Sequence, residues 1–225
     1  MVVAPSLNVY LIPGMSADAA SFASLDWDEQ IFVPIVLPWL EPQNKETLDH
    51  YVGRMSEGID RSQPFALVGV SFGGIIAQEL SLKFDPVATV VISSIKSAAE
   101  KPAWMRLGFH LKLYRLLPFF MMRYINYRPY KILPSSIERR LRQYDHYLPM
   151  RSEHYLRWSV HQILLWDEAG NSSPPIHIHG DRDEMFPLRN ISNAHIIKGG
   201  SHVMIITHAR KISKLLATIL VKSSE

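Results

Sequence analysis

Apolar residues along the chain occur in short uninterrupted runs, separated by segments of helical periodicity. Uninterrupted runs of this length are typical of strands that are buried on both faces. They are LNVYLIPG (7–14), QIFVPIVLP (30–38), PFALVGV (64–70), VATVVISSI (87–95), PIHIHG (175–180) and HIIKG (195–199). Helical spacing appears at 44–60, 72–84 and 207–222. This alternation predicts an α/β fold with a mainly parallel sheet of about six strands and helices on both faces.

Two of these elements carry specific expectations. Pro34 lacks an amide proton and weakens the strand at 30–38. The helix at 44–60 is expected to begin at Asn44, whose side chain is a suitable cap. Its apolar face is predicted to consist of Leu48, Val52, Met55 and Ile59.

Residues 97–170 interrupt the alternation and divide the chain into a core of two parts, 1–96 and 171–225, with an insertion between them. The insertion is aromatic, rich in proline and predominantly helical in pattern. Between Lys101 and Arg157 it holds 12 Lys or Arg and 3 Asp or Glu, a net charge of +9. The whole chain carries +3, so the remainder carries −6. A contrast of this size indicates two parts with different surroundings.

Composition narrows the class of protein further. The 225 residues are 47% apolar and 20% charged, which is typical of a globular protein. Cysteine is absent, which excludes disulfides, thiolate metal sites and a cysteine nucleophile. The N-terminus lacks the pattern of a secretory signal, and no apolar run approaches the roughly 18 residues of a spanning helix. We therefore expect the cytoplasm as the location.

The most specific chemical signal is the stretch GVSFGG at residues 69–74, which joins a predicted strand to a predicted helix. The spacing Gly69-x-Ser71-x-Gly73 is that of a nucleophile elbow. In this tight turn the backbone of the serine is strained, and glycine two residues before and after it avoids a collision of side chains across the turn. The N-terminus of the following helix favours negative charge at the serine oxygen. Ser71 is therefore the candidate nucleophile, and the alternative is a tight turn with a small polar residue.

A serine nucleophile requires a base and a group that orients the base. Candidates follow the last two predicted strands. HGDRDEMFP places Asp181, Asp183 and Glu184 beyond one strand end, and KGGSH places His202 beyond the other. Because the carboxyl ends of parallel strands meet at one edge of the sheet, these side chains are expected near Ser71.

The order of serine, acid and histidine in these motifs resembles that of the α/β-hydrolase fold family. The resemblance covers nearly all of the chain. It implies that Asp183, three residues after Gly180, orients His202 as general base, with Asp181 as the rival acid. It also implies that the insertion is a helical cap over the active site.

The family resemblance also implies an oxyanion hole formed by two backbone N–H groups. The residue after the nucleophile, Phe72, supplies one, and Met15 in the loop after the first strand supplies the other. That loop carries Pro13 where relatives often have histidine. Compared with the family, the sequence is expected to lack the first strands of the sheet, and the 19 residues between Asp183 and His202 are expected to leave little room for a helix.

Three other histidines admit structural interpretations. His177 and His179 alternate along a predicted strand, which is more typical of packing or strand-end hydrogen bonding than of a metal site without a third ligand. His195 begins the next strand and is interpreted as structural.

These features together predict a serine hydrolase that cleaves a carboxylic ester or thioester through an acyl-enzyme. The alternatives are acyl transfer, C–C cleavage or lyase chemistry on the same fold, or a receptor without catalysis. No cofactor or metal is needed, the partner is a small-molecule acyl substrate, and no nucleic-acid partner is expected. The insertion is expected to present a solvated basic surface, to attract anionic substrate, or to contact a membrane surface through 103–124.

Overall fold

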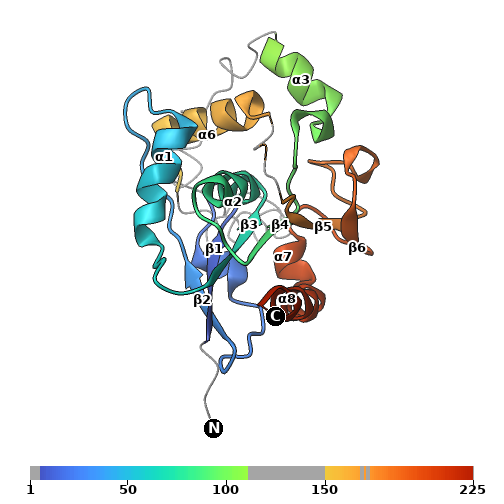
Figure 1. Cartoon of the computed structure of the whole chain (residues 1–225). Helices are drawn as coiled ribbons and strands as arrows, with labels where there is room; N and C mark the ends of the chain where they lie inside the picture. The colour runs from blue at the N-terminus through green and yellow to red at the C-terminus, as the bar shows by residue number, and fades with distance from the viewer. Residues whose placement is uncertain (1–5, 111–149, 168–169, 171–172, 225) are drawn as a thin grey trace, which may run out of the picture.

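The computed structural model describes residues 6–110, 150–167, 170 and 173–224, which form a parallel sheet covered by helices on both faces (Figure 1). The sheet has six strands in the order β2-β1-β3-β4-β5-β6, and every pair is parallel. The strands are β1 (Leu7–Ile12), β2 (Phe32–Val36), β3 (Phe65–Val70), β4 (Ala88–Ile92), β5 (Ile176–Gly180) and β6 (Ala194–Ile197). The predicted fold class and strand number are confirmed.

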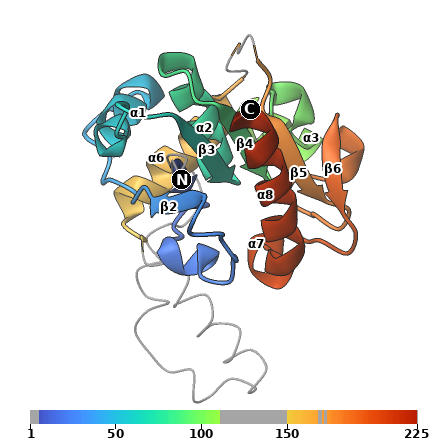
Figure 2. The ribbon, with the colours of Figure 1, turned by 60° about the horizontal axis from the view of Figure 1, so that its bottom comes forward.

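Helices cover the sheet in two layers (Figures 1 and 2). The α-helices of the described part are α1 (Leu48–Met55), α2 (Phe72–Lys83), α3 (Ala103–His110), α6 (Glu153–Leu165), α7 (Met204–Thr207) and α8 (Ala209–Ser224). Helices α1, α2 and α6 contribute to one hydrophobic cluster, and α7 and α8 contribute to another on the opposite side of the sheet. Short 3₁₀ turns lie at 19–22, 56–58, 98–100 and 188–190.

The strands alternate between these two clusters residue by residue. In β1, Tyr10 and Ile12 belong to the cluster with α1 and α2, whereas Val9 and Leu11 belong to the cluster with α8. All four side chains are at most 1% exposed. Because side chains of a strand point alternately to the two faces, a strand covered on both sides must be apolar throughout. This explains the uninterrupted apolar runs of the sequence.

Helix α1 differs from the prediction at both ends. It begins at Leu48, and its cap is the side chain of Thr47, which accepts a hydrogen bond from the His50 N–H at 3.2 Å. The expected cap at Asn44 is therefore wrong. The preceding residues form a turn in which the buried Glu46 carboxylate accepts the Gln43 N–H at 2.7 Å. A carboxylate held in this way satisfies the local backbone without a helix.

The predicted insertion is described only at its two ends, which lie together. Helix α6 contacts both α2 and α3. Lys101, at the entrance to the insertion, is 3% exposed and donates hydrogen bonds to the carbonyl groups of Leu164, at 3.0 Å, and Trp166. These carbonyls close the C-terminal end of α6, where a cation is favourable. Burial lowers the pKa of Lys101 to about 8.

Most of the expectations for the cap lie outside the described residues. They concern the basic residues Lys112, Arg115, Arg123, Arg139, Arg140 and Arg142, and the apolar residues of 111–122. Of the apolar residues that are described, Trp158 and Trp166 are buried, whereas Trp104 and Leu107 are each 58% exposed. The boundaries of the insertion and its surface role stay predictions.

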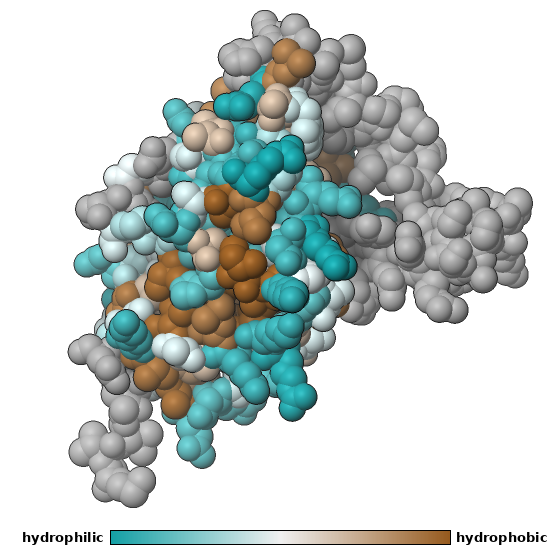
Figure 3. Space-filling model, turned by 90° about the vertical axis from the view of Figure 1, so that its right-hand side faces the viewer, coloured by the Kyte–Doolittle hydropathy of each residue, from teal (hydrophilic) through white to brown (hydrophobic). Residues whose placement is uncertain are grey.

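The surface of the described part presents mixed polar and apolar residues. Figure 3 shows the side that faces right in Figure 1, where apolar side chains reach the surface between polar ones. Strand β6 ends the sheet on this side, and its Ile196 is 46% exposed. No described helix combines the length and apolarity that crossing a bilayer requires.

Candidate active site

Ser71 lies in the turn between β3 and α2 and has a backbone conformation that side chains rarely adopt, with φ 52° and ψ −118°. The turn brings neighbouring backbone segments very close together. A Cβ atom on Gly69 would lie 2.2 Å from the Gly73 carbonyl oxygen, and one on Gly73 would lie 2.3 Å from the Ile12 carbonyl oxygen. Glycine is required at both positions because any side chain would collide with backbone. The local geometry is that of the predicted elbow.

The elbow makes a prediction about stability. Gly73→Ala is expected to lower the free energy of unfolding by about 1–3 kcal/mol or more, because its methyl group meets the carbonyls of Ile12 and Pro13 within 2.4 Å. Gly53→Ala is the matched control, since Gly53 lies in helix α1 with nothing within 4 Å of a Cβ. This control should gain up to about 1 kcal/mol from helix propensity. Urea unfolding of both variants measures the difference, and equal stabilities would contradict the packing argument.

Three residues from separate parts of the chain form a continuous hydrogen-bonded line at the ends of the strands. Ser71 Oγ lies 3.0 Å from His202 Nε2. His202 Nδ1 lies 2.9 Å from Asp183 Oδ2 and 3.2 Å from Asp183 Oδ1. The structure therefore brings together the three residues that the sequence proposed.

The partners of His202 determine its tautomer. A carboxylate only accepts hydrogen bonds, so Nδ1 carries the proton and donates a hydrogen bond to Asp183. In the neutral ring Nε2 then has a free lone pair and accepts the hydroxyl proton of Ser71. This is the protonation state that a general base requires. The His202 side chain is 27% exposed, whereas that of Asp183 is fully buried.

Asp183 is held by the loop that follows β5. Its Oδ1 accepts the N–H groups of Met185 and Phe186, each at 2.9 Å. The Phe186 ring meets the His202 ring edge-on, with centroids 5.5 Å apart. A buried carboxylate with several donors is satisfied and fixed in orientation. The loop thus fixes both the carboxylate and the imidazole that it contacts.

Close packing of two glycines brings this loop to the loop that carries His202. A Cβ on Gly180 would lie 2.2 Å from the Gly200 carbonyl oxygen. The same oxygen accepts the Arg182 N–H at 2.8 Å. Asp181, the rival acid, lies at the exposed side of this contact and accepts the Gly199 N–H at 2.6 Å. The carboxylate that reaches His202 is therefore that of Asp183, and Asp181 joins the two loops.

The connection between Asp183 and His202 has no α-helix, as expected from its 19 residues. It contains only the 3₁₀ turn at 188–190 and strand β6. Strand β6 contains His195, which is exposed. Apart from the 3₁₀ turn and β6, the connection between Asp183 and His202 is irregular.

The residues that carry the two candidate oxyanion donors lie close to Ser71. Phe72 follows it directly, and a Cβ on Gly14 would lie 3.7 Å from Ser71 Cβ, so the Gly14–Met15 loop packs against the nucleophile. Within the described part of the chain, neither the Met15 N–H nor the Phe72 N–H donates a hydrogen bond. Two unpaired amides beside a serine hydroxyl are suited to bind a developing oxyanion. Asp18, in the same loop, caps the 3₁₀ turn at 19–22 by accepting the Ala20 N–H at 2.9 Å.

His177 and His179 are buried and hydrogen-bonded to each other. His179 Nε2 donates to the Phe186 carbonyl at 2.8 Å, so its Nδ1 accepts from His177 Nε2 at 3.2 Å. Burial lowers the pKa of His179 and lowers that of His177 to about 3, which keeps both rings neutral. The described residues contain no cluster of three or more residues that could hold a metal ion. The packing interpretation of this pair fits the structure.

The structure also places two aromatic residues at the Met15 loop that the sequence did not single out. The Trp39 indole N–H donates to the Gly14 carbonyl at 2.9 Å, and the Tyr155 hydroxyl accepts the Ser16 N–H at 3.2 Å. Trp39 follows β2 and Tyr155 belongs to α6, so neither is near the loop in sequence. No local sequence pattern indicates such long-range contacts.

One known protein family matches nearly the whole chain. A model of the "Alpha/beta hydrolase family" matches residues 2–215. No curated protein matches the chain.

Solved structures provide several matches across nearly the whole chain. An esterase from Exiguobacterium antarcticum has a TM-score of 0.65 at 14% identity, over 96% of this chain and 92% of that one. A bromoperoxidase from Bacillus anthracis has a TM-score of 0.62 at 18% identity, over 96% and 92%. A thermophilic esterase from Thermogutta terrifontis has a TM-score of 0.61 at 14% identity, over 98% and 92%. At these identities the likeness shows a shared fold.

Proposed function

The chain belongs to the alpha/beta hydrolase family, and from this premise we propose that it is a serine hydrolase that cleaves a carboxylic ester or thioester. The observation that carries the proposal is the line from Ser71 Oγ through His202 to Asp183, with contacts of 3.0 and 2.9 Å. Several structural neighbours are described as esterases or carboxylesterases, which supports an ester as substrate. The proposed partner is a small-molecule acyl substrate.

In the first half of the reaction, Ser71 Oγ attacks the carbonyl carbon of the substrate while His202 Nε2 takes the hydroxyl proton. The carbonyl π electrons move to oxygen, and the Met15 and Phe72 N–H groups bind the resulting oxyanion. When the oxyanion collapses, the bond to the leaving group breaks and His202 returns the proton to the departing alcohol or thiol. An acyl group remains on Ser71.

In the second half, water attacks the acyl-enzyme and His202 again accepts a proton. Collapse of the second oxyanion breaks the bond to Ser71 Oγ, which takes the proton back from His202, and releases the carboxylic acid. Asp183 stabilises the imidazolium that forms twice in the cycle, because its buried carboxylate faces Nδ1 at 2.9 Å. None of these steps uses a metal or an organic cofactor.

A fluorophosphonate probe tests the proposed nucleophile, and a series of p-nitrophenyl esters of increasing chain length tests the substrate class. We expect covalent labelling at Ser71, located by peptide mass spectrometry, together with ester turnover. Labelling without turnover of any ester or thioester would favour acyl transfer, lyase chemistry or a receptor. Absence of labelling at Ser71 would refute the proposal.

The two aspartates of the β5 loop provide a matched pair of variants. Asp183→Asn is expected to lower kcat by about 10³–10⁴-fold, because an amide no longer favours the Nδ1-protonated tautomer of His202. Asp181→Asn should stay within about threefold, since its carboxylate contacts only the Gly199 N–H at the loop surface. Steady-state kinetics on one ester measure both. A larger loss in Asp181→Asn would contradict the assignment.

A further inference from the structure

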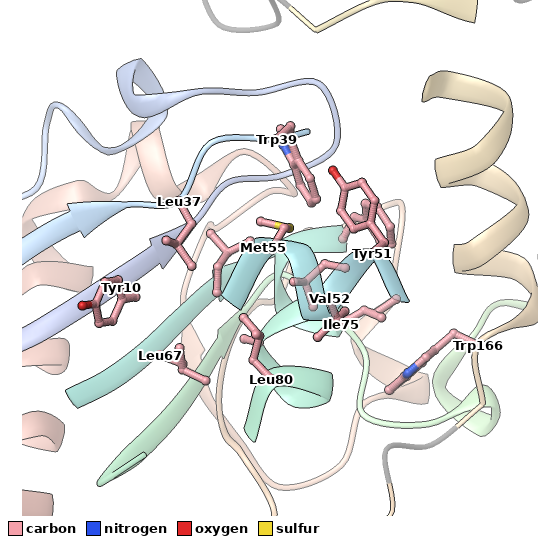
Figure 4. Packing of buried hydrophobic residues seen from close by; sticks show 14 of the residues in the cluster. Tyr10, Leu37, Trp39, Tyr51, Val52, Met55, Leu67, Ile75, Leu80 and Trp166 are labelled. Carbon is pink, nitrogen blue, oxygen red and sulfur yellow. The ribbon is translucent and has the colours of Figure 1, made fainter. Parts of the chain in front are cut away.

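We propose that Trp39 is a positioning residue for the oxyanion hole, which it orients through the Gly14–Met15 peptide and the Phe72 ring. The inference rests on the proposed function, because it assigns a means of holding the two amides that would bind the oxyanion. Trp39 lies in the loop after β2 and is 9% exposed. Figure 4 shows its ring beside Tyr51, above α1.

The first contact acts on the peptide group that carries the Met15 N–H. Trp39 Nε1 donates to the Gly14 carbonyl oxygen at 2.9 Å. That carbonyl and the Met15 N–H belong to one planar peptide group, in which the two bonds point in opposite directions. Holding the oxygen on the Trp39 side therefore turns the N–H away from Trp39. A donor to the carbonyl also polarises the peptide, which strengthens its N–H as a donor.

The second contact is with the side chain of Phe72, the residue that carries the other amide of the proposed hole. The Trp39 and Phe72 rings are stacked, with centroids 5.2 Å apart and an interplanar angle of 9°. Phe72 is 1% exposed, and its backbone N–H is the second proposed donor. One indole thus contacts the peptide that carries the Met15 N–H and the side chain of Phe72. A buried indole N–H needs an acceptor, and the acceptor here is the carbonyl of the peptide that carries the Met15 N–H.

Tyr155 supports the same loop at its next peptide group, and its ring lies beside that of Trp39, with centroids 5.8 Å apart. Its hydroxyl accepts the Ser16 N–H, which belongs to the peptide on the other side of the Met15 Cα atom. Ser16 has φ 67°, a conformation that costs free energy for a residue other than glycine and so requires external support. Burial raises the pKa of Tyr155, which keeps the hydroxyl protonated. The peptides before and after Met15 are therefore each held by one aromatic side chain.

The size of the effect follows from what remains when the indole N–H is lost. The Gly14 carbonyl also accepts the Ala17 N–H at 3.0 Å, so the loop keeps one of two hydrogen bonds. Removal of an oxyanion donor itself costs about 10²–10³-fold in kcat. Loss of one supporting hydrogen bond should cost less, about tenfold. The loss should fall on kcat, because the oxyanion forms only along the reaction.

Trp39→Phe tests the inference, because it keeps an aromatic ring for the stack on Phe72 and removes the N–H. Trp158→Phe is the matched control. Trp158 lies in the same cluster, meets the Phe72 ring edge-on at 6.1 Å, and donates its indole N–H to the Glu46 carbonyl at 2.8 Å, away from the oxyanion loop. Both variants lose the same atoms from the same core. Only the first loses the contact to Gly14.

Three measurements are made on each full-length variant: kcat and KM for one p-nitrophenyl ester, the rate constant for fluorophosphonate labelling of Ser71, and hydrogen exchange of the peptide containing residues 14–18. Trp39→Phe is expected to lower kcat and the labelling rate about tenfold, to leave KM within about twofold and to accelerate exchange in 14–18. Trp158→Phe should leave all three near wild type.

The outcomes separate this inference from the proposed function. A wild-type protein that labels at Ser71, with equal kcat in Trp39→Phe, would overturn the inference and leave the hydrolase intact. Equal losses in the two tryptophan variants would also overturn it, because the effect would then be one of core packing. A wild-type protein that neither labels nor turns over an ester would overturn the proposed function and this inference with it.

Discussion

Ser71→Ala is expected to abolish fluorophosphonate labelling and to lower ester turnover by about 10⁵–10⁶-fold, leaving only the residual rate that binding and the oxyanion loop support. The reason is chemical: without Oγ there is no atom to form the acyl-enzyme, and His202 has no hydroxyl proton to accept. The fold should be unaffected. Alanine keeps the Cβ atom of serine, so the strain of the backbone at φ 52° is little changed, and the cap of α2 loses no side-chain hydrogen bond.

Ser201→Ala is the control for this variant. Ser201 precedes the proposed base, and its hydroxyl makes no hydrogen bond among the described residues, so activity should stay within about twofold. Thermal unfolding of both variants should agree with wild type within a few degrees. Substantial turnover in Ser71→Ala would refute the mechanism as a whole. Loss of activity in Ser201→Ala alone would mean that Ser201, and not Ser71, is the nucleophile.

The central strands were predictable because their burial on both faces makes nearly every position apolar. β3 consists of six consecutive buried residues, and the run PFALVGV shows this directly. The elbow was predictable for a related reason. Gly69 and Gly73 are required by close backbone contacts, and such a requirement is visible as a fixed glycine spacing in one short stretch of sequence.

The beginning of helix α1 was not predictable from local preference. Asn44 and Thr47 are both good caps, and the choice depends on Glu46, whose buried carboxylate also meets the Arg54 guanidinium at 3.3 Å. The local sequence suits a cap at Asn44 as well as one at Thr47. Packing therefore decides which of the two residues caps the helix. Exact helix ends commonly depend on contacts of this kind.

The residues that hold the oxyanion loop were hidden for a different reason. Trp39 and Tyr155 lie 25 and 139 residues from their hydrogen-bond partners. A tryptophan after a strand and a tyrosine in an amphipathic helix are ordinary core residues by any sequence pattern. Their second role depends on where one polar atom of each ring points, which only the folded chain determines.

His202→Ala should lower kcat by about 10⁵–10⁶-fold, with the protein still folded, because Ser71 then has no group to accept its proton. His208→Ala is the matched control. His208 follows α7, contacts the Thr207 hydroxyl at 3.0 Å and is not part of the line to Ser71, so its removal should change kcat by less than about threefold. Discontinuous assays on a reactive p-nitrophenyl ester cover the range of rates that both variants require.

The double variant Ser71→Ala/His202→Ala distinguishes a working unit from two independent contributions. If the serine and histidine act only through each other, either single change already removes the step in which the proton moves between Oγ and Nε2, across 3.0 Å. The double variant should then be no slower than either single one. Multiplied losses would instead mean that His202 assists the reaction without Ser71. Residual activity equal in all three variants is the expected result, and it would measure what the oxyanion loop contributes by binding alone.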